Sequence, residues 1–482
     1  MTTAVLTIGL TLAHGAAITV LLLHQRRQPA ATLAWLLTLV LLPGVGLVAY
    51  RLIGQTRYQR TIKRSKLAGE RIDAVRRRFD VERKLDRATA AVPEPRTVGL
   101  LRLGAAVSST RSSPGNRVRL LIDGAATYRA MLLAIEAAEH HVNIEFYIVQ
   151  PDETGRRLRE RLVRTAERGV QVRVLVDGIG SSRLPRDFWK PLEAAGGKAA
   201  VFRPVPPLWY RPLRRDRVDF RDHRKIIVVD GRVGFTGGIN IGREYLGLDP
   251  DMGAWRDTHI ELRGPAVLSL QSAFAENWFY STGEELDDER QFPEPEWTPD
   301  GAVVQVVDSG PDTNWNPIEA MYAHAISGAE HRVWITNPYF IPSPTIENVL
   351  IAASLRGVDV RLLVPLRSDS RLVQIASRSY FPRLIEAGVR VFRFSPGFVH
   401  AKTMVVDEWV GTVGSANMDM RSFQLNFELN PFIVGAALAN SLAEEFLDDL
   451  RRSEEVTLAD LAKVTVFGRL ASNLARLASP LL

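Results

Sequence analysis

Cysteine is absent from the 482 residues of the chain. Its absence excludes disulfide bonds, thiolate metal sites and a cysteine nucleophile, and it leaves the redox compartment undetermined. The sequence also lacks the Gly-x4-Gly-Lys-Ser/Thr loop that cradles nucleotide phosphates. No Asp, Glu and His residues cluster at metal-ligand spacing, so we predict a reaction that needs neither a metal ion nor another cofactor.

Acidic residues are in the minority: the chain has 54 Asp and Glu but 61 Lys and Arg, which gives a formal net charge of +7. A basic surplus favours a partner with negative charge, such as a nucleic acid, an anionic lipid or a phosphorylated substrate. The surplus is concentrated in residues 51–84, where twelve Lys and Arg outnumber four Asp and Glu for a net charge of +8. The rest of the chain is therefore close to neutral.

Formally charged side chains are missing from residues 4–23 and again from residues 29–50. Each segment is about long enough to span a bilayer, and the start lacks the basic region of a cleaved secretory signal. We therefore predict a transmembrane helical hairpin over residues 1–50. Pro43, Gly44 and Gly46 leave open a kinked or re-entrant second helix. The density of positive charge in residues 51–84 indicates that this segment lies on the cytoplasmic side of the membrane. Its basic side chains either attract anionic lipid headgroups or only determine the orientation of the hairpin in the membrane.

The globular part contains an internal repeat. Residues 134–142 (AIEAAEHHV) match residues 325–333 (AISGAEHRV), and residues 168–177 (RGVQVRVLVD) match residues 356–365 (RGVDVRLLVP). In both copies apolar strands alternate with helices, which indicates a mainly parallel sheet flanked by helices. We predict an α/β fold of two pseudo-symmetric halves. The expected parts are residues 1–50 (hairpin), 51–116 (basic segment and linker), 117–280 (first half), 281–300 (acidic linker), 301–455 (second half) and 456–482 (amphipathic C-terminal segment).

Two peripheral segments have open interpretations. Residues 204–219 (PVPPLWYRPLRRDRVD) form an insertion in the first half, either a lid that contacts headgroups or an ordinary surface loop. After residue 456, large apolar residues recur at spacings of three and four with basic residues between them. This pattern is typical of an amphipathic helix, which either lies on a membrane or packs on the domain, the commoner outcome.

A longer motif occurs once in each half, as residues 223–240 (HRKIIVVDGRVGFTGGIN) and residues 400–417 (HAKTMVVDEWVGTVGSAN). Each copy has the pattern His-x-Lys-x4-Asp, followed by a Gly-Gly or Gly-Ser pair two residues before an Asn. The apolar run after the lysine predicts a buried strand with His and Lys side by side at its start. A single such pair is usually an ordinary solvated pair, but two matched copies indicate a function.

The two copies together supply the groups that exchange of a phosphodiester requires. One group must attack phosphorus and another must protonate the leaving oxygen, and histidine suits both tasks because its pKa is near about 6.5. We expect His223 and His400 to meet in one site. The ammonium groups of Lys225 and Lys402 would contact the non-bridging phosphate oxygens. Further hydrogen bonds to phosphate are expected from Asn240, Ser415 and Asn417.

The spacing of this motif resembles the HKD motif of the phospholipase D superfamily. Five further stretches, LIDGAATYRAML, IEFYIV, WRDTHIEL, NPYFIP and GSANMDMRSFQLNFELN, resemble bacterial cardiolipin synthases of that superfamily, which also begin with a membrane hairpin. The resemblance implies transfer of a phosphatidyl group from one phosphatidylglycerol to another, giving cardiolipin and glycerol. It makes His223 the nucleophile that forms a phosphohistidine, and His400 the acid and then the base. The symmetric copies fit the opposite assignment equally well.

The resemblance also assigns four carboxylates. Asp230 and Asp407 complete the motif and belong to its catalytic set, although their role is more structural than chemical. Asp257 and Glu428 are expected to hydrogen-bond a catalytic imidazole and fix its tautomer. An ordinary salt bridge is the alternative for these two residues.

The resemblance places the chain in the inner membrane of a bacterium. It implies a multi-pass protein with its catalytic part on the cytoplasmic side, which acts on phosphatidylglycerol and other anionic lipids and does not bind nucleic acid. A homodimer is not chemically required, because one chain carries both half-sites. Alternative functions are a hydrolase of the phospholipase D type, another phosphatidyltransferase of anionic lipids, a nuclease and a lipid-binding scaffold without turnover.

Overall fold

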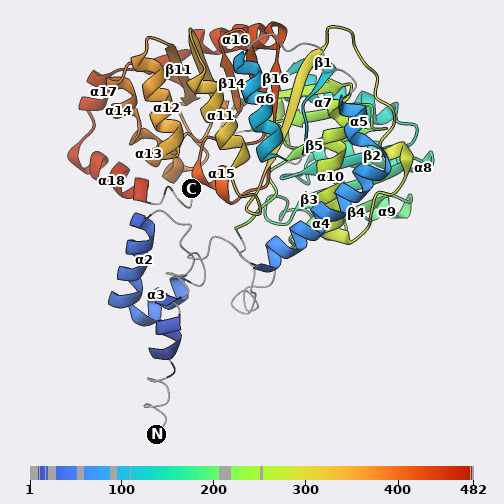
Figure 1. Ribbon diagram of the computed structural model, residues 1–482, viewed down its shortest axis with the longest axis horizontal. Coiled ribbons are helices and arrows are strands. Elements are labelled where there is room, and N and C mark those ends of the chain that lie inside the picture. The colour runs from blue at the N-terminus through green and yellow to red at the C-terminus, as the bar shows by residue number, and fades with distance from the viewer. Residues whose placement is uncertain are drawn as a thin grey trace. The chain divides into compact units, whose positions relative to one another are not determined.

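The computed structural model divides the chain into two units, residues 1–63 with 207–218 and residues 64–206 with 219–482 (Figure 1). It describes residues 9, 11–16, 18–19, 29–50, 59–86, 95–108, 110–205, 219–249, 253–477 and 479. Residues 24–28, which separate the two uncharged segments, and most of the predicted insertion at residues 204–219 lie outside the described residues.

The second hydrophobic segment forms two helices, α2 (Pro29–Leu41) and α3 (Pro43–Ala49). Leu42 separates them with non-helical angles, φ −129° and ψ 66°. The break has a local cause, because Pro43 disfavours a helical conformation in the residue before it and cannot donate a backbone hydrogen bond. The kink that the sequence left open is therefore present.

Helix α3 folds back along α2. The rings of Trp35 and Tyr50 are 5.3 Å apart, whereas fifteen residues of a straight helix would separate them by about 22 Å. Gly46 permits this approach, because a Cβ atom there would lie 2.5 Å from a backbone oxygen of α2. Within the described part of the chain, no helix has both the length and the apolar character needed to cross a bilayer.

One sheet runs through both halves of the second unit (Figure 1). The first half contributes β1 (Ser113–Ile122), β2 (His141–Phe146), β3 (Gln171–Asp177), β4 (Lys198–Phe202), β5 (Lys225–Val229), β6 (Val233–Gly237) and β8 (Thr258–Arg263). The second half contributes β9 (Ala302–Ser309), β10 (Arg332–Thr336), β11 (Asp359–Pro365), β12 (Arg390–Phe394), β14 (Thr403–Val406), β15 (Val410–Val413), β16 (Glu428–Val434) and β17 (Ser453–Val456).

The strand order reflects the internal repeat. The order is β17-β12-β11-β10-β14-β15-β16-β9-β1-β8-β6-β5-β2-β3-β4. Apart from the edge strand β17, reading outward from the contact between β9 and β1 gives equivalent strands in the two halves. The predicted α/β architecture of two pseudo-symmetric halves is therefore confirmed.

The prediction of a mainly parallel sheet is wrong. Only β2-β3-β4 and β10-β11-β12 pair in parallel within this sheet, and the other neighbouring strands pair antiparallel. In the first half, Asp230 and Gly231 connect β5 to β6 with φ angles of 53° and 66°. Two positive φ angles in a short connection indicate a hairpin turn, for which Asp-Gly is a strong sequence signal.

Three hydrophobic cores stabilise the second unit. The helices α10 (Ala266–Thr282) and α16 (Ala436–Arg451) bury residues in a core that strands of both halves share. A separate core of the first half lies beneath α7 (Asp123–Glu136), α8 (Glu153–Glu167) and α9 (Lys190–Ala194). The corresponding core of the second half lies beneath α11 (Pro317–Ser327), α12 (Pro344–Leu355), α13 (Arg371–Arg378) and α14 (Phe381–Glu386). The shared core joins the two halves.

The basic segment packs on the first half rather than remaining free. Its helices are α4 (Gln59–Arg78) and α5 (Val81–Asp86), and their apolar side chains from Ile72 onward enter the shared core. Arg71 lies 3.1 Å from Glu285 and Arg78 lies 2.5 Å from Asp287, both in the acidic linker. These arginines therefore have internal partners, which revises the expectation that the whole segment attracts headgroups.

The predicted linker also contains a helix of the second half. Helix α6 (Pro95–Val107) buries Leu100 in the core of that half, where the side chain is fully shielded from solvent. The linker assignment for residues 51–116 was wrong here, because the apolar face of α6 completes a core that lies more than 200 residues farther along the chain.

Candidate active site

Each motif histidine is anchored to the backbone of the other half. The N–H of His223 donates to the carbonyl of Phe427 at 2.8 Å, and the N–H of His400 donates to the carbonyl of Arg256 at 2.7 Å. Close to His400, β7 (Ala254–Arg256) pairs in parallel with β13 (Gly397–Val399). The start of each histidine motif therefore lies against the opposite half.

Each motif histidine also contacts a carboxylate that belongs to the other half. Nδ1 of His223 lies 3.0 Å from the carboxylate of Glu428, and Nδ1 of His400 lies 2.7 Å from that of Asp257. Both carboxylates are buried. A carboxylate at Nδ1 favours the tautomer with its proton on that nitrogen and leaves Nε2 for chemistry. The structure thus places Asp257 and Glu428 where the sequence expected them, each serving the histidine of the other half.

Burial changes the charge state of the two imidazoles. It lowers the pKa of His223 to about 4, against the opposing effect of Glu428. Burial and the charge of Lys402 lower the pKa of His400 to about 4. Both imidazoles are therefore neutral at pH 7, the form in which a histidine can attack phosphorus or accept a proton.

The motif lysines lie next to their histidines. Nζ of Lys225 donates to the carbonyl of His223 at 2.6 Å, and Nζ of Lys402 donates to that of His400 at 2.5 Å. Burial lowers the pKa of Lys225 to about 7 and that of Lys402 to about 8. The charge of Lys402 also lowers the pKa of Lys225, so the two motifs lie within electrostatic reach of one another.

Opposing charges set the ionisation of the two carboxylates. Burial alone would raise the pKa of Asp257, but His400 and Lys402 outweigh it and the pKa is lowered. Burial would likewise raise the pKa of Glu428, and His223 and Lys225 outweigh it. Both groups therefore stay ionised at neutral pH and can stabilise an imidazolium.

Ser415 does not occupy the phosphate-binding position that the sequence suggested. Its hydroxyl donates to Glu428 at 2.5 Å and accepts from the N–H of Leu429 at 2.9 Å. Its proton is therefore engaged, and the side chain positions the carboxylate. The equivalent residue of the first half is Gly238, where a Cβ atom would lie 2.1 Å from Oδ1 of Asp257. Glycine at position 238 therefore leaves room for the carboxylate of Asp257.

The two motif asparagines differ in their surroundings. Nδ2 of Asn240 donates to the hydroxyl of Tyr245 at 2.8 Å, and its Oδ1 accepts from the N–H of Ile148 at 3.2 Å. Oδ1 of Asn417 is buried without a hydrogen-bond partner among the described residues. Asn417 therefore keeps more of its amide open to a ligand than Asn240 does.

Asp230 and Asp407 have a structural role, so their place in the catalytic set is corrected. The carboxylate of Asp230 accepts three backbone N–H groups from residues 139–141 at 2.8–2.9 Å. Asp407 does the same with residues 330–332 at 2.8–3.0 Å. Each aspartate has a φ angle near +50°. Its carboxylate fixes the backbone at the start of β2 in the first half and of β10 in the second. That position lies at the far end of the motif strand from the histidine.

We expect Asp407→Asn to destabilise the fold while leaving catalysis nearly intact. The amide keeps the backbone conformation but weakens the charged hydrogen bonds, at a cost of about 1–3 kcal/mol. A thermal melt should show a lower Tm, whereas kcat at 25 °C should stay within about twofold. Asp187→Asn, at an exposed position, is the control. A large fall in kcat without a change in Tm would contradict the structural role.

Aromatic side chains that sequence reasoning missed surround the histidines. The ring of Tyr147 lies 4.8 Å from that of His223. Around His400 lie Trp255 at 5.2 Å and Tyr339 at 6.2 Å, measured between ring centroids. Tyr147 and Tyr339 follow β2 and β10, at the carboxyl ends of parallel strands where α/β proteins usually bind ligands. That position was the signal available in the sequence.

Comparisons with known proteins identify the family of the chain. The family described as "Cardiolipin synthase, PLD-like domain" matches residues 131–278 and 322–450, one segment in each half. The cardiolipin synthase of Alkalihalophilus pseudofirmus is 39% identical over 464 residues, which cover 96% of this chain and 91% of that protein. The chain belongs to the cardiolipin synthase family. The family inferred from the motifs is therefore confirmed.

Other relatives agree with this membership. The cardiolipin synthase of Geobacillus thermodenitrificans is 40% identical over 460 residues, which cover 95% of this chain and 90% of that protein. Residues 15–55 match a family described as "Phospholipase_D-nuclease N-terminal". A phosphatidylserine synthase from Haemophilus influenzae has a TM-score of 0.57, at 14% identity over 80% of this chain and all of that one. That likeness shows a shared fold.

Proposed function

We propose that the chain transfers a phosphatidyl group from one phosphatidylglycerol to the free glycerol hydroxyl of a second, giving cardiolipin and glycerol. The observation that carries the proposal is the pair of neutral imidazoles, each held at Nδ1 by a carboxylate of the opposite half. The two lysines supply positive charge for the non-bridging phosphate oxygens. One site then holds a nucleophile, an acid and phosphate-binding groups.

In the first step, Nε2 of His223 attacks phosphorus and the bond from phosphorus to the glycerol oxygen breaks. His400, protonated as the anionic phosphodiester enters, gives its proton to that oxygen, and glycerol leaves. One difference between the motifs favours this assignment. Nζ of Lys402 lies 3.0 Å from Nε2 of His400, whereas Nε2 of His223 has no hydrogen-bond partner among the described residues and is free to attack.

In the second step, His400 is neutral and accepts the proton of the incoming hydroxyl. The hydroxyl oxygen attacks phosphorus, the bond from phosphorus to Nε2 of His223 breaks, and His223 returns to its starting form. Glu428 stabilises the charge that His223 carries while it is phosphorylated. Because one phosphodiester replaces another, the exchange needs no nucleotide.

We also propose that residues 1–50 form a membrane hairpin in the inner membrane of a bacterium, with the catalytic part on the cytoplasmic side. The two uncharged segments and the family match at residues 15–55 support this location. The folded-back pair α2–α3 favours a re-entrant second segment. One chain contains both half-sites, so the reaction does not require a homodimer.

Mass spectrometry of the lipid products tests the proposal. Purified full-length protein is incubated with phosphatidylglycerol vesicles, and cardiolipin and free glycerol should form in equal amounts. Phosphatidic acid as the main product would make water the acceptor and identify a hydrolase. The absence of any lipid product would overturn the proposed function.

The lysines predict how activity depends on pH. A lysine carries its charge below its pKa, so Lys225 (about 7) and Lys402 (about 8) lose positive charge as the pH rises past those values. The two histidines, with pKa values of about 4, become protonated only below that value. We therefore expect kcat/KM for phosphatidylglycerol to fall as the pH rises past about 7 to 8, because the lysines lose the charge that holds the phosphate and His400 is protonated less often. A profile in mixed micelles that stays flat to pH 9 would contradict this.

A further inference from the structure

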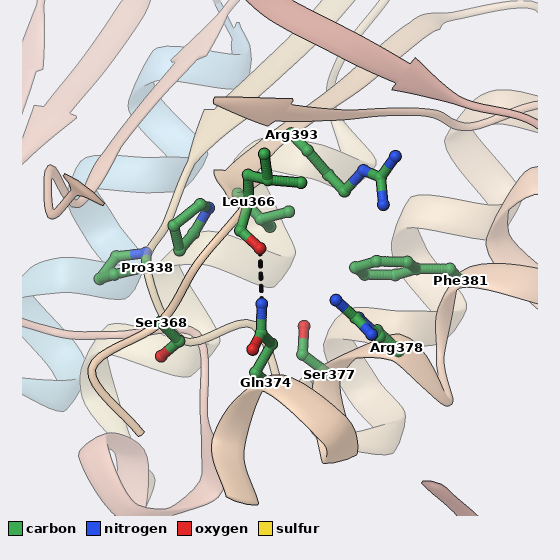
Figure 2. A pocket seen from close by; sticks show the side chains of 10 residues that line it. Pro338, Leu366, Ser368, Gln374, Ser377, Arg378, Phe381 and Arg393 are labelled. Carbon is green, nitrogen blue, oxygen red and sulfur yellow. Dashed lines mark hydrogen bonds between the residues drawn. The ribbon is translucent and has the colours of Figure 1, made fainter. Parts of the chain in front are cut away.

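A small, partly open pocket lies on the same side of the sheet as the catalytic site, where β11 ends and α13 begins (Figure 2). Pro338, which lines it, directly precedes Tyr339, whose ring lies 6.2 Å from that of His400. The strands β10, β11 and β12 are parallel, so their carboxyl ends share one edge of the sheet. The pocket and His400 lie at that same edge.

Two arginines line this pocket, and no acidic residue is among its described lining residues. Figure 2 shows Arg378 and Arg393 reaching the pocket from α13 and β12, with the hydroxyl of Ser377 beside Arg378. Arg378 has no hydrogen bond or ion pair among the described residues. Burial and the charge of Arg393 lower the pKa of Arg378. The two cations therefore repel one another across a space that contains no carboxylate.

Arg393 is only weakly neutralised. Among the described residues, it forms an ion pair with Glu454 alone, at 3.5 Å, and the side chain of Glu454 is 61% exposed. Nε of Arg393 is buried and lacks a hydrogen-bond partner among the described residues. A buried guanidinium N–H without an acceptor is unfavourable unless a ligand supplies one. This second observation, independent of the charge, also points to an anion.

The rest of the pocket wall is well defined. Nε2 of Gln374 donates to the carbonyl of Leu366 at 2.5 Å and fixes α13 against the end of β11 (Figure 2). Phe381, only 3% exposed, supplies an apolar wall. The nearby acid Asp369 accepts from the hydroxyl of Tyr339 at 2.7 Å and is not part of the lining. Guanidinium and hydroxyl donors around one space suit a tetrahedral oxyanion.

We propose that Arg378, Arg393 and Ser377 form a second phosphate-binding subsite. The inference rests on the proposed function, because transfer between two phosphatidylglycerol molecules needs a place for the acceptor's own phosphodiester while its hydroxyl attacks. The product carries two phosphates, so one would lie at the histidines while the other binds in this pocket. The chemistry shared by all occupants is a phosphate group, either of a phospholipid or free.

Site-resolved labelling of arginine tests the subsite directly. Full-length protein in detergent is treated with phenylglyoxal, and modification of Arg378 is followed by peptide mass spectrometry. Dihexanoyl phosphatidylglycerol or inorganic phosphate should slow the labelling of Arg378 several-fold. Dihexanoylglycerol, which lacks phosphate, should not. Arg371, exposed at the start of the same helix, is the internal control and should react equally in all samples.

The two probes identify the source of the phosphate. Protection by the short-chain lipid supports a headgroup subsite, and protection by inorganic phosphate alone assigns the pocket to the free ion. Equal labelling of Arg378 with and without both probes would overturn the proposal. This experiment needs no turnover, so it can succeed even if the proposed transferase activity fails.

Kinetics supply the functional test. The double variant Arg378→Gln with Arg393→Gln should raise KM for phosphatidylglycerol about tenfold and leave phosphohistidine formation from the donor unchanged, because only the acceptor loses a contact. Arg390→Gln, on the same strand but paired with Glu455 at 2.8 Å, is the matched control. Unchanged KM in the folded double variant would contradict an acceptor role.

A separate observation concerns α18 (Val466–Leu477) near the C-terminus. One side contacts the domain, where Arg476 lies over the ring of Tyr380 at 4.3 Å and Ala475 is buried. Large apolar side chains on the helix are exposed by 54–83%, namely Val466, Phe467, Leu470, Leu474 and Leu477. The helix therefore packs on the domain and still leaves these apolar side chains uncovered.

We propose that these exposed side chains of α18 rest in the surface of an anionic bilayer. Residues 463–477 contain Lys463, Arg469 and Arg476 and no acidic residue, which complements anionic headgroups, and such helices bury their apolar face at the headgroup boundary. Because the chain has no native cysteine, Phe467→Cys can carry a single spin label. Leu133→Cys, on α7 and 60% exposed, provides a matched control.

The label reports the depth of α18 after reconstitution into phosphatidylglycerol–phosphatidylethanolamine vesicles. The spin label at residue 467 should collide more often with oxygen, and less often with a water-soluble nickel complex, than the label at residue 133. Equal accessibility of the two labels to the nickel complex would overturn the proposal.

Discussion

Replacing either motif histidine with alanine is expected to lower the rate of cardiolipin formation by at least about 10³-fold, but at different steps. His223→Ala removes the nucleophile and should form no covalent intermediate. His400→Ala removes the acid and base. With a phosphatidyl donor whose leaving group is p-nitrophenol, which departs without a proton, this variant should still phosphorylate His223 and then accumulate the adduct.

The adduct is measured after a rapid alkaline quench, because phosphohistidine survives base and hydrolyses in acid. His140→Ala, at an exposed position outside the site, should behave as the unmodified protein. Accumulation in His223→Ala in place of His400→Ala would reverse the assignment. An adduct in neither variant, despite normal folding, would exclude a histidine intermediate.

The second large effect is expected from replacing the two carboxylates that each contact the histidine of the other half. Glu428→Gln and Asp257→Asn should each lower kcat by about 10²–10⁴-fold with little change in KM, because an amide neither stabilises an imidazolium nor fixes its tautomer. Glu428 contacts His223 and Asp257 contacts His400. Glu428→Gln should therefore mainly slow formation of the adduct, whereas Asp257→Asn should slow both the release of glycerol and the transfer to the acceptor.

Single-turnover kinetics separate these two steps, and the ¹⁵N shifts of the imidazoles report the tautomers directly. Glu160→Gln, an exposed helix residue, is the control for loss of a carboxylate. Equal slowing of both steps by both variants, with unchanged tautomers, would indicate that the carboxylates only maintain the fold.

Much of the site could be predicted because the two halves of the internal repeat could be compared with each other. Two copies of one motif identified His223 and His400, and matching the halves placed Asp257 beside Glu428 as candidate carboxylates. The sequence did not reveal that the partners cross over, since a local pattern carries no information on which distant segments meet. Ser415 was assigned to phosphate for the same reason, because its contact with Glu428 depends on the three-dimensional fold.

The errors in the fold have identifiable causes. Strand and helix alternation suggested a parallel sheet, while the Asp230-Gly231 hairpin signal was available and overlooked. The charge of the basic segment was assigned to lipid before the acidic linker was considered as its partner. Arg378 and Arg393 belong to no motif and come from different elements, so only the folded chain brings them to one pocket.

The joining of the two halves constrains how substrates reach the site. Backbone contacts cross between the halves at β9 with β1, at β7 with β13, and at Asp222 with Phe427. A hinge motion that separated the halves would break all three and pull each histidine from its carboxylate. Donor and acceptor must therefore enter and leave without a separation of the two halves.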